Sequence, residues 1–386
     1  MTSGADSFAL NAQIQQALAR RDPGAALRVL AEAEAAQPQD AELKLQKAMA
    51  LRLSGDLTGA VNALDQALAL EPYNFVALLS KASLIERMDG EKAATPIYKN
   101  ALTIAPETPP PALAAPIAHA REVVARTADA LEAYLEARVG ATDAALDTAT
   151  RARFAESLKI FTGKARNYES EAVLLKYPRL PAIPFFDRAM FPWFPELEAA
   201  TDMIRGELEQ VLREEQADFV PYIQTPEGAP VNQWAELNYN PRWSTYFLWK
   251  DGVKQEAACA KCPGTAALMD RLPLARQDKF APTVMFSALA ANTRIPPHSG
   301  STNTRLLVHL PLILPGPAWF RVGNETRYWK MGEAWAFDDS IDHEAVNEAD
   351  ALRVILIIDI WNPLLTEAER ELITRMMNAK NEFFSS

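Results

Sequence analysis

The chain has 386 residues, of which 49% are hydrophobic and 23% are charged, and its formal net charge is −11. This length allows two domains with ordinary cores, and the composition is that of a globular protein. The acidic balance argues against nucleic acid or an anionic membrane as a partner. No apolar run reaches the roughly 18 residues of a membrane helix, and the start lacks the features of a secretory signal. We therefore expect a cytoplasmic protein without membrane insertion.

The only two cysteines are Cys259 and Cys262. They are too few for a disulfide framework, and a single C-x2-C pair lacks the second ligand pair of a structural zinc site. We expect two free thiols, with a local disulfide or a redox motif as the alternatives.

The first hundred residues repeat with a period of 34 in four columns. The columns are Pro38, Pro72 and Pro106; Ala26, Ala60 and Ala94; Ala33, Ala67 and Ala101; and Leu30, Leu64 and Tyr98. Small alanines let paired helices approach closely, and proline ends the second helix of each unit. The pattern resembles the tetratricopeptide repeat over about three units, without the aromatic and glycine signals of its first helices.

We therefore expect tetratricopeptide-like repeats over 1–108. A proline-rich stretch and renewed helical periodicity then predict a helical linker region over 109–174, where His119 is expected to be structural. Repeats of this kind pack as a scaffold and also present a concave groove. We expect a peptide or protein substrate to contact them, with a plain scaffold as the alternative. The oligomeric state stays open.

From about residue 235 the chain consists of short β-branched and aromatic runs separated by turn signals such as Gly323-Asn324 and Met331-Gly332. The expected strands lie within 243–252, 283–290, 305–314, 318–340 and 352–363. The run RVILIIDIW (353–361) is typical of a strand buried on both faces. Several strands without intervening helices predict a sandwich or jelly roll, whose sheets can enclose a cavity. The chain is therefore expected to be an α+β multidomain protein with this domain over 175–386.

Three of the four histidines, His298, His309 and His343, lie in this strand-rich part. Oxygenases with non-haem iron commonly hold the metal with two histidines and one carboxylate, leaving positions open for substrate and O2. In the usual spacing an acid stands two residues after the first histidine. His298 and His343 are the candidate ligands, but Gly300 occupies the position of the acid. From these residues alone, an iron site and buried structural histidines both remain open.

Two arginines favour the iron hypothesis. Arg353 lies in an apolar strand, where an unpaired charge is unfavourable, and its guanidinium suits a bidentate carboxylate. The period of two places Arg305, Leu307 and His309 on one face of the strand at 304–310. An iron site next to an anion-binding arginine is what a 2-oxoglutarate-dependent oxygenase needs.

The segments HSGSTNTRLLVHLPL (298–312), RVGNETRYWKMGEAWAFDDSIDHEAVN (321–347) and LRVILIIDIWNPLL (352–365) resemble the aspartyl/asparaginyl β-hydroxylase family. The resemblance covers about residues 175–368 and implies an oxygenase domain with a double-stranded β-helix (jelly-roll) fold. Members of this family are similar in using two histidines and a glycine in place of the usual triad. The resemblance therefore implies that His298 and His343 are the iron ligands and that Gly300 is the expected residue.

The same resemblance implies the binding of the cosubstrate. Arg353 and Ser287 would bind the distal carboxylate of 2-oxoglutarate, His309 would bind its end near the metal, and Trp243 would line the site. The implied cofactors are Fe(II), 2-oxoglutarate as cosubstrate, and O2.

The chain departs from the family motif at several positions. Leu307 stands where the family often has a second arginine. Arg305 is the nearest replacement for that cosubstrate contact, or else it binds substrate or packs structurally. Asn362 stands where the family has a histidine. Asp338 and Asp339 are expected either to support His343 or to serve in a turn or cap.

These observations predict an Fe(II)/2-oxoglutarate-dependent dioxygenase that hydroxylates the β-carbon of an Asp- or Asn-type residue in a peptide or protein. A free amino acid or a lipid acyl chain is the alternative substrate, since related enzymes accept non-protein substrates. A catalytically silent adaptor built on the repeats is the alternative of another class, and Leu307 is the one feature in its favour.

Overall fold

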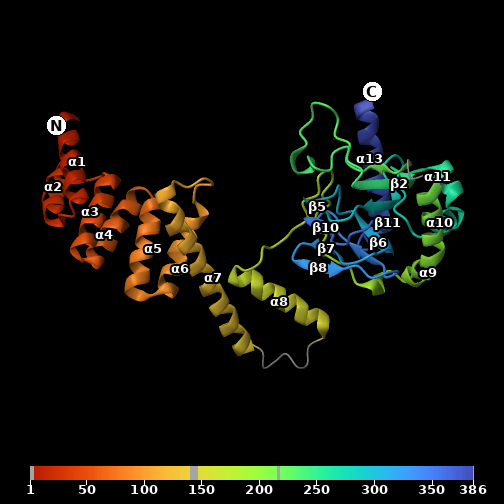
Figure 1. Cartoon of the computed structure of the whole chain (residues 1–386), viewed down its shortest axis with the longest axis horizontal. Coiled ribbons are helices and arrows are strands. Elements are labelled where there is room, and N and C mark those ends of the chain that lie inside the picture. Colours follow the sequence, from red (N-terminus) through yellow and green to blue (C-terminus); the bar gives the residue numbers. More distant parts are fainter. Residues whose placement is uncertain (1–3, 140–146, 215–217, 386) are drawn as a thin grey trace. The chain divides into compact units, whose positions relative to one another are not determined.

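The computed structural model describes residues 4–139, 147–214 and 218–385, and the chain divides into two compact units, Met1–Ala165 and Arg166–Ser386. The first unit is built of helices and the second is built around strands (Figure 1). Within the described residues, every helix is too short or too polar to span the hydrocarbon layer of a membrane.

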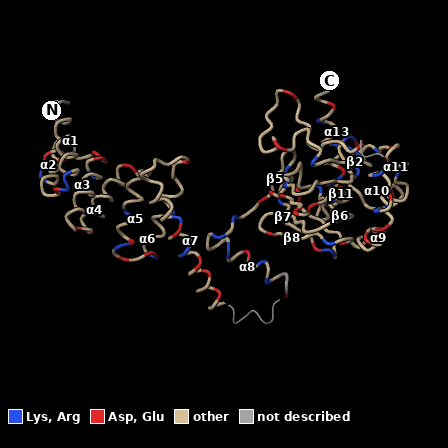
Figure 2. The backbone as a smooth tube through the Cα atoms, viewed as in Figure 1, with Lys and Arg blue, Asp and Glu red and all other residues tan. Residues whose placement is uncertain are grey.

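The described part of the first unit consists of helices, of which the first six pack as successive pairs. The helices are α1 (Gly4–Ala19), α2 (Pro23–Ala36), α3 (Ala41–Ser54), α4 (Leu57–Leu70), α5 (Phe75–Asp89), α6 (Glu91–Thr103), α7 (Pro111–Val139) and α8 (Thr148–Thr162). An Asp or Asn precedes several of them, because its side-chain oxygen accepts a hydrogen bond from a free N–H of the first turn. These capping residues are Asp22, Asp40, Asp56, Asn74 and Asp147. Basic and acidic residues are interspersed along these helices (Figure 2).

The columns of the sequence repeat lie in the contacts between helices. Ala26, Ala60 and Ala94 are 0% exposed, and Leu30, Leu64 and Tyr98 are 1% exposed. The proline column follows the ends of α2, α4 and α6, as expected of a residue that cannot continue a helix. The predicted pairing of helices through small contact residues is confirmed.

The region expected as a linker, 109–174, is divided between the two units. Helix α7 packs on the repeats, because its buried Ile117 and Val123 form one cluster with Tyr98 of α6. The second unit begins at Arg166 rather than at residue 175. The segment before 175 already bonds to that unit, since the Val173 N–H donates to the carbonyl of Gly300, between β5 and β6, over 3.0 Å.

The second unit contains two antiparallel sheets. Their strands are β1 (Val220–Pro221), β2 (Trp243–Lys250), β3 (Val253–Lys254), β4 (Val284–Leu289), β5 (Thr293–His298), β6 (Arg305–Ile313), β7 (Ala318–Val322), β8 (Glu325–Tyr328), β9 (Trp335–Phe337), β10 (His343–Asn347) and β11 (Arg353–Trp361). The larger sheet has the order β1-β2-β4-β11-β6-β9, and β3 pairs with β2. The smaller sheet has the order β5-β10-β7-β8.

Helices cover one face of the larger sheet, and the smaller sheet packs against the other face. The helices of this unit are α9 (Phe194–Ala199), α10 (Thr201–Glu214), α11 (Glu256–Lys261), α12 (Pro263–Arg271) and the terminal α13 (Glu367–Ser385). On β11, Leu356 and Ile358 pack into the cluster shared with α10 and α12. Ile355 and Ile357 pack into the cluster shared with the smaller sheet. The predicted burial of this strand on both faces is confirmed.

Each segment expected to be extended contains at least one strand, and the turn at Gly323-Asn324 joins β7 to β8. Besides the two-residue strands β1 and β3, the strands β5 and β10 were not predicted. The β5 sequence TRIPPH carries two prolines, which lack the N–H that a strand donates. Strand β10 is short and begins with polar residues. These two strands carry the two candidate metal ligands.

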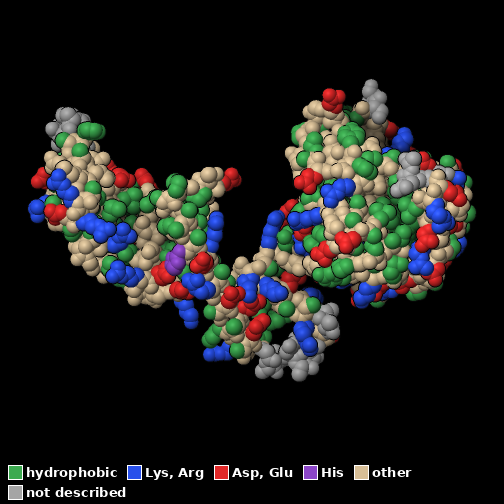
Figure 3. Space-filling model, in the orientation of Figure 1, with side chains coloured by type: hydrophobic (Ala, Val, Ile, Leu, Met, Phe, Trp, Pro, Cys, Tyr) green, Lys and Arg blue, Asp and Glu red, His purple; other side chains and the backbone are tan. Residues whose placement is uncertain are grey.

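Cys259 and Cys262 are free and buried, as expected from the sequence. Burial raises the pKa of the Cys259 thiol to about 11 and that of the Cys262 thiol to about 12. Both are therefore protonated and unreactive at neutral pH. On the face of this unit seen in Figure 3, hydrophobic, basic and acidic side chains are intermixed.

Candidate active site

Two histidines meet where β5 and β10 pair. His298 is the last residue of β5, His343 is the first of β10, and the two are partners in the antiparallel register. Their ring centroids are 4.1 Å apart. The Nδ1 of His298 bonds to the carbonyl oxygen of Pro296 and the Nδ1 of His343 to that of Ile341, each over 2.8 Å. Because a carbonyl only accepts, Nδ1 carries the proton in each ring, and Nε2 keeps its lone pair.

Both rings are neutral at neutral pH. Burial lowers the pKa of His298. Burial lowers the pKa of His343 well below its ordinary value, and the neighbouring His298 lowers it further. Neutral imidazole is the form that binds a metal.

The carboxyl group of Asp339 lies beside Gly300, which stands two residues after His298. The Gly300 N–H donates to the backbone carbonyl of Asp339 over 2.6 Å. A Cβ on Gly300 would lie 1.9 Å from Oδ2 of Asp339, so that carboxyl group already fills the space of a side chain at position 300. Burial raises the pKa of Asp339 to about 8. Asp338 has a different role, because its Oδ1 accepts from the Ser340 N–H over 3.0 Å and so supports the turn.

The histidines face a cavity of about 350 Å³ between the two sheets. Strands of both sheets contribute to its wall, since the period of two turns alternate side chains of each strand inward. The expected site residues among its lining are Trp243, Ser287, His298, His309, His343 and Arg353, and Gly300 and Leu307 also line it. Residues of β2, β4, β5, β6, β10 and β11, far apart in the chain, are thereby brought to one site.

Arg353 is the largest fully buried side chain, at 1% exposure. Its one hydrogen bond among the described residues is a long one of 3.5 Å from Nη1 to the Ser287 carbonyl, and its Nε has no partner there. The guanidinium carbon lies 4.6 Å from the centre of the Trp329 ring. Burial lowers the pKa of Arg353 to about 9, so the group is still a cation at neutral pH. A buried cation in this position is suited to an anionic ligand.

The neighbours of Arg353 add polar groups to the same wall. The Trp243 indole N–H donates to the Ser287 hydroxyl oxygen over 3.2 Å, which leaves the hydroxyl proton available to a ligand. His309 is 4% exposed, and its Nδ1 has no hydrogen-bond partner among the described residues. Burial lowers the pKa of His309 well below its ordinary value, and the positive charge of Arg353 lowers it further.

Arg305 is not among the residues that line the cavity. It lies on the same strand face as Leu307 and His309, but its guanidinium forms an ion pair with Asp359. The Arg305 guanidinium also stacks on the Phe280 ring at 4.3 Å. Asp359 in turn accepts a hydrogen bond of 2.9 Å from the Thr283 N–H. Of the roles considered for Arg305, these contacts favour structural packing over a cosubstrate contact.

Several aromatic residues of the site were not predicted from the sequence. Trp329 and Phe320 lie in the wall, and Tyr222 and Trp234 lie close to the histidine end. The Trp234 ring is 4.9 Å from that of His298, and the Tyr222 ring is 4.3 Å from that of Trp243. An aromatic side chain is equally typical of a hydrophobic core, so no signal in the sequence distinguished these residues.

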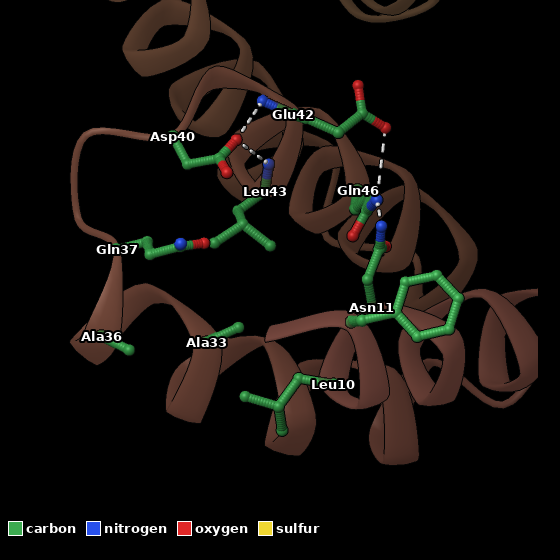
Figure 4. A pocket seen from close by; sticks show the side chains of 10 residues that line it. Leu10, Asn11, Ala33, Ala36, Gln37, Asp40, Glu42, Leu43 and Gln46 are labelled. Atoms are coloured by element: carbon green, nitrogen blue, oxygen red, sulfur yellow. Dashed lines mark hydrogen bonds between the residues drawn. The ribbon is translucent and has the colours of Figure 1, made fainter. Parts of the chain in front are cut away.

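The helical unit has two hollows of about 410 Å³ on its surface. Gln46 of α3 lines both, and Figure 4 shows it between Glu42 and Asn11. Its Nε2 donates to Asn11 Oδ1 over 3.0 Å and to Glu42 Oε1 over 3.2 Å. Its Oε1 is buried without a hydrogen-bond partner among the described residues. His119 of α7 is half exposed and bonds to Glu86 over 2.9 Å, in agreement with a structural role.

Comparison with known proteins identifies the family. The aspartyl/asparaginyl beta-hydroxylase family model matches residues 198–363, which include both histidines of the pair and Arg353. The ornithine lipid ester-linked acyl 2-hydroxylase of Rhizobium tropici is 36% identical over 203 residues, which are 52% of this chain and 68% of that protein. The chain belongs to the aspartyl/asparaginyl β-hydroxylase family.

Other family members match the same half of the chain. The aspartyl/asparaginyl beta-hydroxylase of Mus musculus is 32% identical over 46% of this chain and 24% of its own length. The aspartate beta-hydroxylase domain-containing protein 2 of Xenopus tropicalis is 31% identical over 50% of this chain and 51% of its own length. The chain thus spans only a quarter to a half of these two relatives.

Two solved structures show a low level of similarity to parts of the chain. The Sgt2 tetratricopeptide domain of Aspergillus fumigatus is 17% identical, with a TM-score of 0.29, and it covers 32% of this chain and 81% of its own. A Cupin_2 domain of a regulator from Enterobacter cloacae is 10% identical, with a TM-score of 0.19, over 21% of this chain and 81% of its own. At these TM-scores the likenesses add nothing to the folds described above.

The hydroxylase-family site fits a metal held by two side chains. Among the residues that the structure describes, no group of three or more His, Cys, Asp or Glu is arranged to hold a metal ion. Two neutral imidazoles, one buried and one partly buried, whose Nε2 atoms have no hydrogen-bond partner among the described residues, suit Fe(II), with positions open for other ligands. The buried Arg353 Nε donor and the His309 Nδ1, which lack partners among the described residues, suit a carboxylate ligand beside that metal. Both groups therefore fit the residues present.

Proposed function

We propose that this member of the family is an Fe(II)- and 2-oxoglutarate-dependent hydroxylase whose strand-rich unit is a jelly roll (double-stranded β-helix). One observation carries the proposal: a pair of metal-competent histidines and an uncompensated buried arginine share one cavity of about 350 Å³. When bound, iron, 2-oxoglutarate and O2 would supply the oxidant for a C–H bond, with succinate and CO2 as the products of the cosubstrate.

The chain's own residues bind and orient these groups. His298 and His343 hold Fe(II) through Nε2, while the backbone carbonyls at their Nδ1 atoms fix the orientation of both rings. Arg353, with the Ser287 hydroxyl, binds the distal carboxylate of the cosubstrate. His309, on the neighbouring strand, binds the end nearer the metal. The apolar wall excludes water, which strengthens each of these polar contacts.

The charge of the wall limits the substrate. Among the described lining residues, Arg353 is the one Lys or Arg side chain. If Arg353 binds the cosubstrate, an aspartate side chain would find no further Lys or Arg in the wall to pair with, whereas an asparagine side chain needs none. Of the expected Asp- and Asn-type residues of a peptide or protein, the Asn-type therefore fits better.

A lipid acyl chain is the second candidate substrate. The outer part of the cavity is lined by Val173, Tyr222, Ile223 and Trp234, and Val173 is 78% exposed. An apolar entrance of this kind suits a hydrocarbon chain. The Rhizobium tropici relative is named as an acyl 2-hydroxylase, which supports this candidate. The presence of His298, His343 and Arg353 in the cavity argues against a catalytically silent adaptor, for which Leu307 is the one feature in favour.

The helical repeats would contact a peptide or protein. The Gln46 Oε1 is a buried acceptor at the border of both hollows (Figure 4), and a peptide N–H is a suitable donor for it. Exposed Met49 and Val76 offer apolar contacts nearby, at 48% and 46% exposure. This pairing of amide and apolar groups is suited to a neutral segment of peptide.

The test is turnover of 2-oxoglutarate by the purified chain with added Fe(II), followed as succinate. We expect succinate from the wild type and none from the His298→Ala/His343→Ala double variant. Matched peptides that differ only in Asp or Asn, and a bilayer-dispersed acyl lipid, are then incubated and searched by mass spectrometry for a gain of one oxygen. A wild type that neither binds Fe(II) nor forms succinate would overturn the proposal.

A further inference from the structure

Trp329, which follows β8, has an indole N–H that no contact accounts for. The residue is 6% exposed, and its Nε1 lacks a hydrogen-bond partner among the described residues. A buried indole N–H normally finds an acceptor, because leaving a buried donor unpaired costs about 1–3 kcal/mol. Trp329 also lines the cavity, so a bound molecule can reach it.

The face of the Trp329 ring lies against the buried guanidinium. The Arg353 guanidinium carbon is 4.6 Å from the ring centre, and Arg353 is 1% exposed. A cation over an aromatic face is stabilised by the ring's electron density, most strongly when both are removed from water. Stacking of this kind leaves the N–H edge of a guanidinium free in its own plane. The Trp329 ring therefore contacts the cation without using its donors.

Three buried polar groups without partners thus belong to residues that line the same cavity. The Arg353 Nε, the His309 Nδ1 and the Trp329 Nε1 all lack a hydrogen-bond partner in the described part of the chain. The ring of Trp329 is 6.0 Å from that of His309. The three side chains come from β11, from β6 and from the segment after β8. Arg353 Nε and Trp329 Nε1 are donors, and His309 Nδ1 is a donor when that nitrogen carries the ring proton, so together they indicate a site for an anion with several acceptor oxygens.

We propose that Trp329 is part of the binding site for the distal carboxylate of the cosubstrate, positioning the Arg353 guanidinium with its ring face and donating its indole N–H to the carboxylate. This rests on the proposed function, which assigns a short 2-oxo dicarboxylate to the cavity. Trp329 would add a neutral donor beside the Arg353 cation and would extend the anion site across the gap between the two sheets.

Trp335 is a matched control in the same cluster. It is 4% exposed, its Nε1 also lacks a partner among the described residues, and its ring stacks on that of Trp329 at 5.9 Å. Trp335 does not line the cavity and does not contact Arg353 through its ring. A change in packing alone should therefore affect both tryptophan positions alike, whereas loss of a ligand contact should affect Trp329 only.

The experiment measures binding by calorimetry, without turnover, on the full chain with Mn(II). The probes are N-oxalylglycine, an unreactive analogue that carries the distal carboxylate, and oxalate, which has only the metal-chelating end. We expect Trp329→Phe to weaken the binding of N-oxalylglycine by about tenfold or more, because the substitution removes a hydrogen bond to a charged group. Trp329→Leu, which also removes the aromatic face, should weaken it further. Oxalate should bind to all variants as to the wild type, and Trp335→Phe should bind both probes normally.

The outcomes separate the inference from the function on which it rests. Trp329 is not part of the distal site if Trp329→Phe binds N-oxalylglycine as tightly as the wild type does. The same conclusion follows if the variant loses as much affinity for oxalate as for N-oxalylglycine. A wild-type chain that binds Mn(II) and oxalate but not N-oxalylglycine overturns both the inference and the dicarboxylate assignment. Near-ultraviolet circular dichroism checks that each variant is folded, and the milder Phe variant remains informative if the Leu variant unfolds.

Discussion

A Cβ on Gly300 would lie 1.9 Å from Oδ2 of Asp339, and a backbone hydrogen bond of 2.6 Å joins the two residues. Position 300, two residues after His298, has no carboxyl group of its own. The carboxyl group of Asp339 lies in the same region instead. No side chain larger than hydrogen fits at Gly300 unless Asp339 moves.

This contact predicts a coupled pair of substitutions. Gly300→Ala should destabilise the chain by about 1–3 kcal/mol, the usual effect of overpacking. The Gly300→Ala/Asp339→Ala variant should recover much of that loss, because the carboxyl group that the methyl meets is gone. Urea denaturation of the two single variants and the double variant measures the coupling. Strictly additive effects would show that the two side chains do not compete for this space.

The histidine pair predicts which residues bind a metal. His298→Ala or His343→Ala should each weaken Mn(II) or Fe(II) binding by more than the roughly 10- to 100-fold typical of losing a supporting partner. His119→Ala is the control, because His119 lies half exposed in the helical unit and bonds to Glu86. Calorimetric titration with the metal distinguishes them. Equal loss in the His119 variant, or none in either of the other two, would contradict the ligand assignment.

Arg353 predicts a pH dependence of cosubstrate binding. Burial lowers the pKa of this cation to about 9, so the charge is present below that pH and is lost as the pH rises through it. Affinity for N-oxalylglycine should be level near neutral pH and then fall above about pH 9, by up to about tenfold per pH unit. Oxalate, which lacks the distal carboxylate, serves as the control ligand. A parallel fall for oxalate would assign the pH dependence to another group.

The ion pair of Arg305 and Asp359 predicts a change in stability without a change in cosubstrate binding. Asp359→Asn should destabilise the chain by about 3–5 kcal/mol, since it leaves a buried cation without its partner. Replacing both residues, as Arg305→Met/Asp359→Leu, should be far less harmful because no charge is then buried. Urea denaturation measures the free energy of unfolding, and calorimetry measures the affinity for N-oxalylglycine. If the folded double variant loses affinity tenfold, Arg305 does contribute to the cosubstrate site.

Several features of this protein follow from local patterns in its sequence. The alanine columns at a period of 34 predict the helix pairs, because each small residue meets a neighbouring helix at the same place in every unit. The continuous apolar run of β11 predicts burial on both faces, since a strand with one solvent-exposed face alternates apolar and polar residues. The identities of His298, His343 and Arg353, at their spacing, favour an iron and dicarboxylate site before any contact is known.

Other features depend on tertiary contacts between segments that are distant in the chain. Strands β5 and β10 form although prolines and polar residues weaken their local signal, because each pairs with the other in the smaller sheet. The ion pair of Arg305 joins β6 to β11, and the stacking of Trp329 on Arg353 crosses from the segment after β8 to β11. Local periodicity tells which face of an element is buried, but it does not tell which residue from elsewhere lies opposite. Local sequence patterns therefore indicate most of the helices and strands and the chemistry available. Cross-strand pairing and sheet packing decide which side chains share the cavity and which are neutralised outside it.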